Sequence, residues 1–141
     1  MTSLLEQAIA LAVEAHAGQR DKAGNPYILH PLYLMSQMET EDERITAVLH
    51  DIVEDTTVTM DDLVKLGFPS AILTALCLLT HDSAVPYNDY ILQLKANPLA
   101  RRVKLADLAH NMDIRRLKNP TEKDWSRLAK YRLAWDMLAY G

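Results

Sequence analysis

The chain has 141 residues, of which 49% are apolar and 24% charged, a composition that suits one globular domain spanning residues 1–141. Its net charge of −4 excludes a general electrostatic attraction to nucleic acid. No apolar run reaches the length of a membrane span and the N-terminus lacks a signal peptide, so we expect a soluble cytoplasmic protein with no membrane partner. The single Cys77 excludes an intramolecular disulfide, and its apolar neighbours predict a buried thiol.

Ala and Leu dominate, Gly and Pro are few, and no segment has the pattern of a strand. We therefore predict an all-α fold, a single-domain helical bundle of about eight helices. Each expected helix begins at a capping residue or a proline, and together they cover 3–17, 31–38, 40–55, 59–66, 69–80, 86–97, 98–118 and 121–138. Capping boxes are expected at Ser3 with Glu6 and at Thr40 with Glu43.

The most informative stretch is Leu49–Thr57, with the sequence LHDIVEDTT. Treated as part of the helix that opens at Thr40, it places its apolar residues on one stripe, with His50 and Glu54 on the other side and Asp51 and Asp55 beside them. A solvated polar face is the simple interpretation. However, no Lys or Arg lies among these carboxylates, so a divalent cation is the alternative that would neutralise them.

Three separated stretches carry side chains of the metal-binding type: His30, then His50 with Asp51, then Asp107. Two imidazoles and two carboxylates make a mixed nitrogen and oxygen site, which suits manganese, iron or zinc better than calcium or magnesium. Four protein ligands leave coordination positions free for water, as catalysis requires.

The third stretch, VKLADLAHNMD, forms one helix in this prediction and places Lys104, Asp107 and Asn111 on one side. Taken alone, Asp107 would be a surface aspartate, and the Asn111 amide would bond to nearby backbone. His110 has two interpretations, as a packing residue or as a hydrogen-bond partner of a ligand carboxylate.

These residues resemble a known family. HDIVED is similar to the HD…ED pattern of HD-domain phosphohydrolases, and PYILHP upstream with VKLADLAHNM downstream narrows the likeness. Together the three blocks resemble the hydrolase domain of the RelA/SpoT family and its stand-alone small alarmone hydrolases. The resemblance implies an all-helical, Mn²⁺-dependent enzyme that removes pyrophosphate from the 3′ position of (p)ppGpp, a small nucleotide substrate.

The resemblance also implies a role for each matching residue. Its metal ligands match His30, His50, Asp51 and Asp107. Its catalytic pair matches Glu54 and Asp55, of which we expect Glu54 to position or deprotonate a water and Asp55 to orient or protonate. The residues expected to bind substrate are Lys22, Arg20, Lys104 and Asn111.

Two departures affect the expected nucleoside contacts. Asp21 stands where the family usually has Arg, and Ile114 stands where it has Thr. Two alternatives therefore stay open: a phosphohydrolase acting on another nucleotide, such as a deoxynucleotide monophosphate or NADPH, and a non-catalytic nucleotide-binding module. Intact Glu54 and Asp55 argue against the second, because extra carboxylates repel bound phosphate. The oligomeric state, including a homo-oligomer, stays open.

Overall fold

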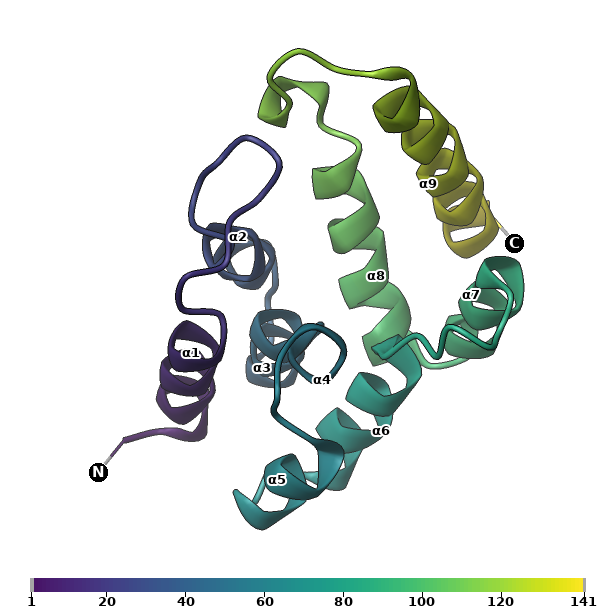
Figure 1. Cartoon of the computed structure of the whole chain (residues 1–141). Helices are drawn as coiled ribbons and strands as arrows, with labels where there is room; N and C mark the ends of the chain where they lie inside the picture. The colour runs from purple at the N-terminus through teal and green to yellow at the C-terminus, as the bar shows by residue number, and fades with distance from the viewer. Residues whose placement is uncertain (1, 141) are drawn as a thin grey trace.

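The computed structural model describes residues 2–140, which form α-helices joined by short connections (Figure 1). In chain order these are α1 (Leu4–Ala15), α2 (Leu29–Ser36), α3 (Glu41–Leu49), α4 (Ile52–Asp55), α5 (Met60–Lys65), α6 (Ser70–Leu79), α7 (Tyr87–Lys95), α8 (Pro98–Asn111), the 3-10 turn η1 (Ile114–Arg116) and α9 (Glu122–Tyr140). Over residues 2–140 there is no strand, only an isolated bridge between Arg20 and Pro26. The predicted all-α fold is confirmed.

Local side-chain chemistry explains where several helices begin. The Ser3 hydroxyl accepts from the Glu6 N–H at 3.1 Å, and the Glu6 carboxylate accepts from the Ser3 N–H at 2.9 Å. Thr40 with Glu43 makes the same reciprocal pair at α3. Such a box satisfies two backbone N–H groups that a helix start leaves without partners, and each cap stabilises by about 1 kcal/mol.

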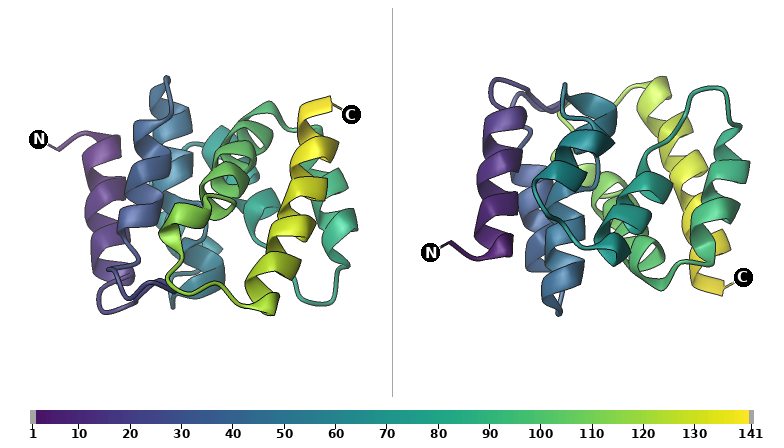
Figure 2. Two further views of the ribbon diagram at one scale, coloured as in Figure 1. Left: turned by 90° about the horizontal axis from the view of Figure 1, so that it is seen from above. Right: turned by 90° about the horizontal axis from the view of Figure 1, so that it is seen from below.

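The apolar faces meet in two clusters that share the middle of the bundle. One lies among α1, α3, α4, α5 and α6, and includes the fully buried Leu49, Ile52 and Ile72. The other lies among α2, α6, α7, α8 and α9. Figures 1 and 2 place α1 and α9 at opposite ends, with α3, α6 and α8 between them. The chemistry-bearing residues of α2, α3 and α8 are thereby brought toward one another.

The predicted continuous helix through LHDIVEDTT is wrong. The structure breaks it at His50 and Asp51, since α3 ends at Leu49, α4 begins at Ile52, and Asp51 has φ −119° and ψ 12°. Both side chains are buried and find polar partners outside a regular helix: the His50 ring lies 2.9 Å from the Ala47 carbonyl, and Asp51 accepts from Tyr27. These competing bonds account for the interruption.

Two further predictions need correction. The helix expected over 98–118 ends at Asn111, because the Asp113 carboxylate caps a new turn by accepting from the Arg115 N–H at 3.1 Å. Cys77 is exposed rather than buried, since α6 buries only one side and leaves Cys77 on the other. Within residues 2–140, no helix combines the length and the apolar character needed to cross a bilayer.

Candidate active site

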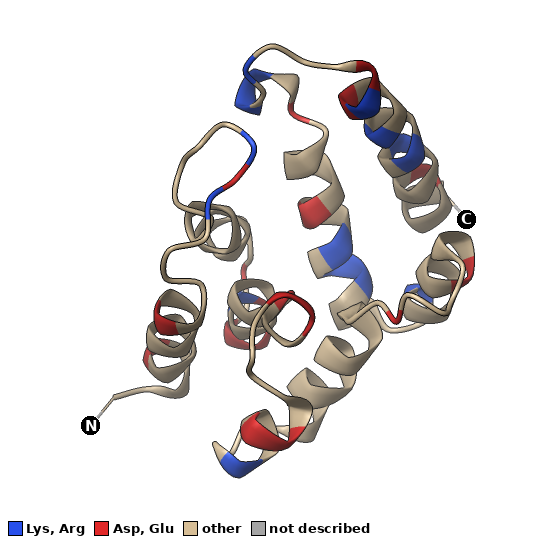
Figure 3. Ribbon diagram, viewed as in Figure 1, with Lys and Arg blue, Asp and Glu red and all other residues tan. Residues whose placement is uncertain are grey.

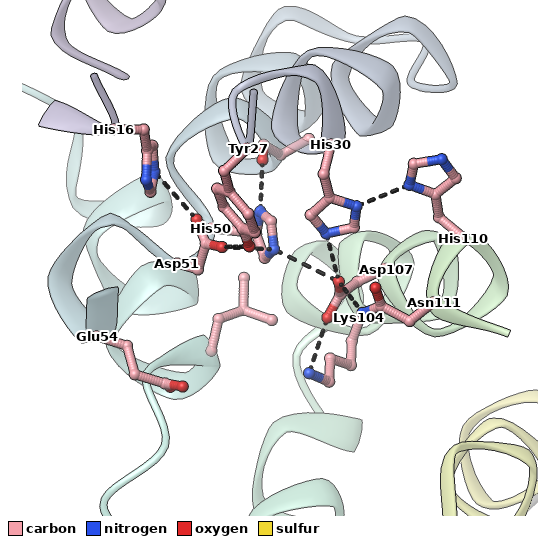
Figure 4. A network of polar contacts seen from close by, with 12 residues as sticks. His16, Tyr27, His30, His50, Asp51, Glu54, Lys104, Asp107, His110 and Asn111 are labelled. Carbon is pink, nitrogen blue, oxygen red and sulfur yellow. Dashed lines mark hydrogen bonds and ion pairs between the residues drawn. The ribbon is translucent and has the colours of Figure 1, made fainter. Parts of the chain in front are cut away.

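Two imidazoles and one carboxylate converge from three helices. His30 lies in the first turn of α2, His50 follows α3, and Asp107 lies in α8 (Figure 4). The Nε2 atom of His30 is 2.9 Å from Oδ1 of Asp107, and Nε2 of His50 is 3.5 Å from the same oxygen. All three residues are buried, and each offers a ligand atom within 4.8 Å of the other two. The surface-aspartate interpretation of Asp107 is therefore wrong.

Asp51 lies beside this group. Its Oδ2 atom is 3.6 Å from Nε2 of His50 and accepts a hydrogen bond from the Tyr27 hydroxyl. Its Oδ1 atom is buried and has no hydrogen-bond partner among residues 2–140, although Nε2 of His16 lies 3.3 Å away. A buried carboxylate oxygen without a donor is costly, and a bound cation would remove that cost.

The charges around the site also fit a cation. Burial alone would raise the pKa of Asp107, but the charges of Lys104 and His50 hold it well below its usual range. Burial alone would lower the pKa of His50, but the charges of Asp51 and Asp107 outweigh it and raise the pKa to about 9. His50 is then a protonated imidazolium beside two carboxylates, and a divalent ion would displace that proton to bind. The donor set therefore fits a divalent metal.

The predicted acid–base pair, Glu54 and Asp55, lines the same cavity as His50 and Asp107. The Glu54 carboxylate accepts from the His81 backbone N–H at 2.7 Å, which ties α4 to the connection before α7. Burial, followed by the charges of Asp51 and Glu54, raises the pKa of Asp55 to about 6. Although the helix is interrupted between His50 and Glu54, both still line one cavity of about 310 Å³ with Asp55 and Asp107.

A second cavity, of about 260 Å³, adjoins the first and shares Tyr27, Asn111 and Tyr131 with it. Basic residues of the 19–27 loop, η1 and the first half of α9 gather around it (Figure 3). The four predicted substrate residues are divided between the two: Lys104 lines the first, Arg20 and Lys22 line the second, and Asn111 lines both.

Ion pairs and turns hold the 19–27 loop in place. The Lys22 ammonium is 2.9 Å from the Asp124 carboxylate in the first turn of α9. The Asp21 carboxylate accepts from the backbone N–H groups of Ala23 and Asn25, at 3.0 and 2.9 Å, which shapes the turn. Asp21, a departure from the family pattern, thus has a clear structural role in this loop.

No protein-family model matches the chain. Among curated proteins, the GTP pyrophosphokinase of Myxococcus xanthus is 28% identical over 148 residues, which is 92% of this chain and 19% of that protein. The bifunctional (p)ppGpp synthase/hydrolase SpoT of Escherichia coli is 39% identical over 66 residues, covering 44% of this chain and 9% of the relative. The chain thus spans less than a fifth of the length of either relative.

A solved structure titled as a metazoan ortholog of SpoT that hydrolyses ppGpp matches with a TM-score of 0.81 at 21% identity. The match covers 100% of this chain and 88% of that one. The chain has the same fold as this SpoT ortholog. Fold and sequence similarity together confirm the resemblance that the three motifs predict.

In this SpoT-type fold, sequence reasoning missed one residue beside the metal-type donors and did not identify the partner of another. Tyr27, within the PYILHP block, donates to Asp51. His110 places Nδ1 at 2.7 Å from Nδ1 of His30, with the two rings parallel, and the Tyr33 ring stacks on it at 4.1 Å. His110 therefore packs beside a metal-type donor, as the first interpretation expected, and its hydrogen-bond partner is the imidazole of His30 rather than a carboxylate. Nothing in the spacing of these residues revealed the contacts.

His110 controls which nitrogen of His30 carries a proton. Burial and the nearby Arg116 lower the pKa of His110 to about 4, so His110 is neutral near pH 7. If its Nδ1 accepts, the proton lies on Nδ1 of His30, and Nε2 of His30 would be free to bind a metal ion in place of its contact with Asp107.

We expect His110→Ala to weaken metal binding by about 10- to 100-fold, because His30 loses the acceptor that fixes its tautomer. Calorimetric titration with Mn²⁺ measures this, and circular dichroism melting checks the fold. His110→Gln supplies an amide oxygen as acceptor and should recover part of the affinity. Wild-type affinity in His110→Ala would show that the contact does not orient His30.

Proposed function

We propose that this chain is a metal-dependent phosphohydrolase that releases pyrophosphate from the 3′ position of (p)ppGpp. One observation carries the proposal: His30, His50 and Asp107 form one buried donor cluster, and His50 and Asp107 line the cavity that Glu54, Asp55 and Lys104 also line. The SpoT-type fold and the relatives named for (p)ppGpp synthesis and hydrolysis support the choice of substrate. The chain spans only a small part of those relatives, and its own site residues are the stronger support for the activity.

His30, His50, Asp51 and Asp107 would hold the ion, which we take to be Mn²⁺ from the mixed nitrogen and oxygen donors. When bound, it would polarise a phosphate oxygen and make water more acidic. Oδ1 of Asp51, which is buried and accepts no hydrogen bond from residues 2–140, supports including Asp51 among the ligands.

Residues of the chain itself would carry out the proton transfers of the hydrolysis. Water attacks the phosphorus attached to the 3′ oxygen, that P–O bond breaks, and the 3′ oxygen takes up a proton as diphosphate leaves. Glu54, held by the His81 N–H, accepts the proton of the water. Asp55, with a pKa of about 6, carries a proton that it can donate near neutral pH.

Two residues would bind the substrate around the broken bond. The Lys104 ammonium, 2.9 Å from Oδ2 of Asp107, faces the cavity and would contact phosphate oxygens. The Asn111 amide donates to Asp107 at 3.0 Å and lines both cavities, so it would contact the sugar. Arg20 and Lys22 would meet the remaining phosphates or the base in the second cavity.

A specific observation favours keeping a second candidate. Asp21 is engaged by its own loop and lies 4.0 Å from Arg116, so the second cavity differs from the family pattern at the place where the base is expected. A different nucleotide, such as a deoxynucleotide monophosphate or NADPH, is the alternative substrate. A non-catalytic nucleotide-binding module is the third.

Phosphate and pyrophosphate release distinguishes these candidates. We would incubate the chain and Mn²⁺ with ppGpp, pppGpp, NADPH and common nucleoside mono- and triphosphates. Pyrophosphate release from ppGpp is the expected result. Turnover of another nucleotide alone would assign the site to that substrate, and nucleotide binding without any turnover would indicate a binding module.

A further inference from the structure

One wall of the first cavity is formed by α7 and α9 and carries a lysine. The chemistry proposed above assigns no role to the residues of this wall. Lys130 of α9 and Tyr87 of α7 both line this cavity, together with Lys104 of α8. The Lys130 ammonium lies 4.0 Å from the centre of the Tyr87 ring, and α7 packs against α9. This cation–π contact holds a long, exposed lysine at the cavity edge.

These two side chains have hydrogen-bonding capacity that the described part of the chain does not use. Over residues 2–140 Lys130 makes no ion pair, whereas Lys22 and Lys104 each pair with an aspartate at 2.9 Å. The Tyr87 hydroxyl is buried and has no hydrogen-bond partner there. Burial raises the pKa of Tyr87, so the phenol keeps its proton and can donate. A buried hydroxyl without a partner is unusual and points to a missing ligand.

The rest of the cavity explains what kind of ligand is missing. Four carboxylates, from Asp51, Glu54, Asp55 and Asp107, line the same space and repel an anion. Lys104 is already neutralised in part by Asp107, so it cannot alone offset the charge of a diphosphate. The ammonium of Lys130 on α9 and the phenol of Tyr87 on α7 are hydrogen-bond donors suited to the oxygens of a second phosphate.

We propose that Lys130 and Tyr87, next to Lys104, form a subsite that binds the terminal phosphate of the leaving diphosphate. This inference rests on the proposed function and deepens it. The inner phosphate of this diphosphate, which the water attacks, lies near Lys104, and the terminal phosphate lies against Lys130 and Tyr87. The site thereby selects nucleotides that carry a diphosphate, rather than a monophosphate, at the position of cleavage.

The test compares inorganic diphosphate with orthophosphate, titrated calorimetrically into the Mn²⁺-loaded chain at fixed free Mn²⁺. We expect Lys130→Gln to weaken diphosphate binding about tenfold, because one charge-assisted hydrogen bond is lost, while orthophosphate binding changes less than about twofold. Tyr87→Phe keeps the ring beneath Lys130 and should weaken diphosphate binding about threefold. Lys123→Gln, an exposed lysine near the start of α9 that lines neither cavity, is the matched control.

The same variants assayed with ppGpp separate this inference from the proposed function. Weaker diphosphate binding by Lys130→Gln without any ppGpp turnover by the wild type would support the subsite and overturn the proposed substrate. Turnover of ppGpp with unchanged diphosphate affinity in both variants would overturn the subsite alone. Equal weakening of diphosphate and orthophosphate would also overturn it, because the effect would then be one of general charge.

Discussion

Asp107→Asn should reduce turnover by at least about 10³-fold and abolish metal binding, because the change removes a charged ligand and its charge-assisted bonds. The Asp107 carboxylate lies 2.9 Å from His30 and 2.9 Å from Lys104, and it accepts from Asn111 at 3.0 Å. An amide of the same shape presents only one acceptor and no charge. Pyrophosphate release and Mn²⁺ titration by calorimetry measure both effects.

The same change also tests the stability of the buried network. The Lys104 side chain is only 13% exposed, so loss of its partner leaves a buried charge and should lower the free energy of unfolding by about 3–5 kcal/mol. Denaturant unfolding measures this and shows whether the variant is folded in the assay. Asp136→Asn, which removes an exposed carboxylate on α9, is the control and should change neither quantity. A folded Asp107→Asn chain that binds Mn²⁺ normally would remove Asp107 from the ligand set.

Glu54→Gln should lower kcat by about 10²- to 10⁴-fold while leaving metal affinity and stability unchanged. The glutamine oxygen can still accept from the His81 N–H, so the connection before α7 stays in place. Only the ability to take up a proton is lost. Single-turnover assays of pyrophosphate release measure the chemical step directly.

Glu41→Gln, an exposed glutamate in the first turn of α3, is the control for the loss of one negative charge. If Glu54→Gln instead unfolds or loses the metal, the carboxylate has a structural role at the α4 connection. If it retains full turnover, another group accepts the proton, and Asp55 is the next residue to replace.

The fold was predictable where it depends on neighbours in sequence. The Ser3 and Thr40 caps and the apolar stripe of α3 are local patterns, and the structure confirms them. The interruption at His50 and Asp51 was not predictable, because its cause includes a hydrogen bond from Tyr27, twenty-four residues away in sequence. The early end of α8 likewise depends on the Asp113 cap outcompeting continued helix.

The candidate site was likewise predictable only in part. Motif order was enough to select His30, His50 and Asp107, and the structure brings these three together. Their roles, and those of Asp51, Glu54 and Asp55, stay predictions until the experiments above are done. The stacking of His110 on His30, eighty residues earlier in sequence, could not be foreseen, because it requires the packing of α2 against α8.

If the donors from α2, α3 and α8 bind an ion as proposed, their convergence would link metal availability to folding. The unfolded chain holds His30 and Asp107 far apart, so an ion that needs both binds only the native state. Thermodynamic linkage then adds about 2.7 kcal/mol of stability when free metal reaches a hundred times its dissociation constant. In metal-poor surroundings the chain would therefore lose both its cofactor and part of its resistance to proteolysis, and its abundance would follow the supply of the ion.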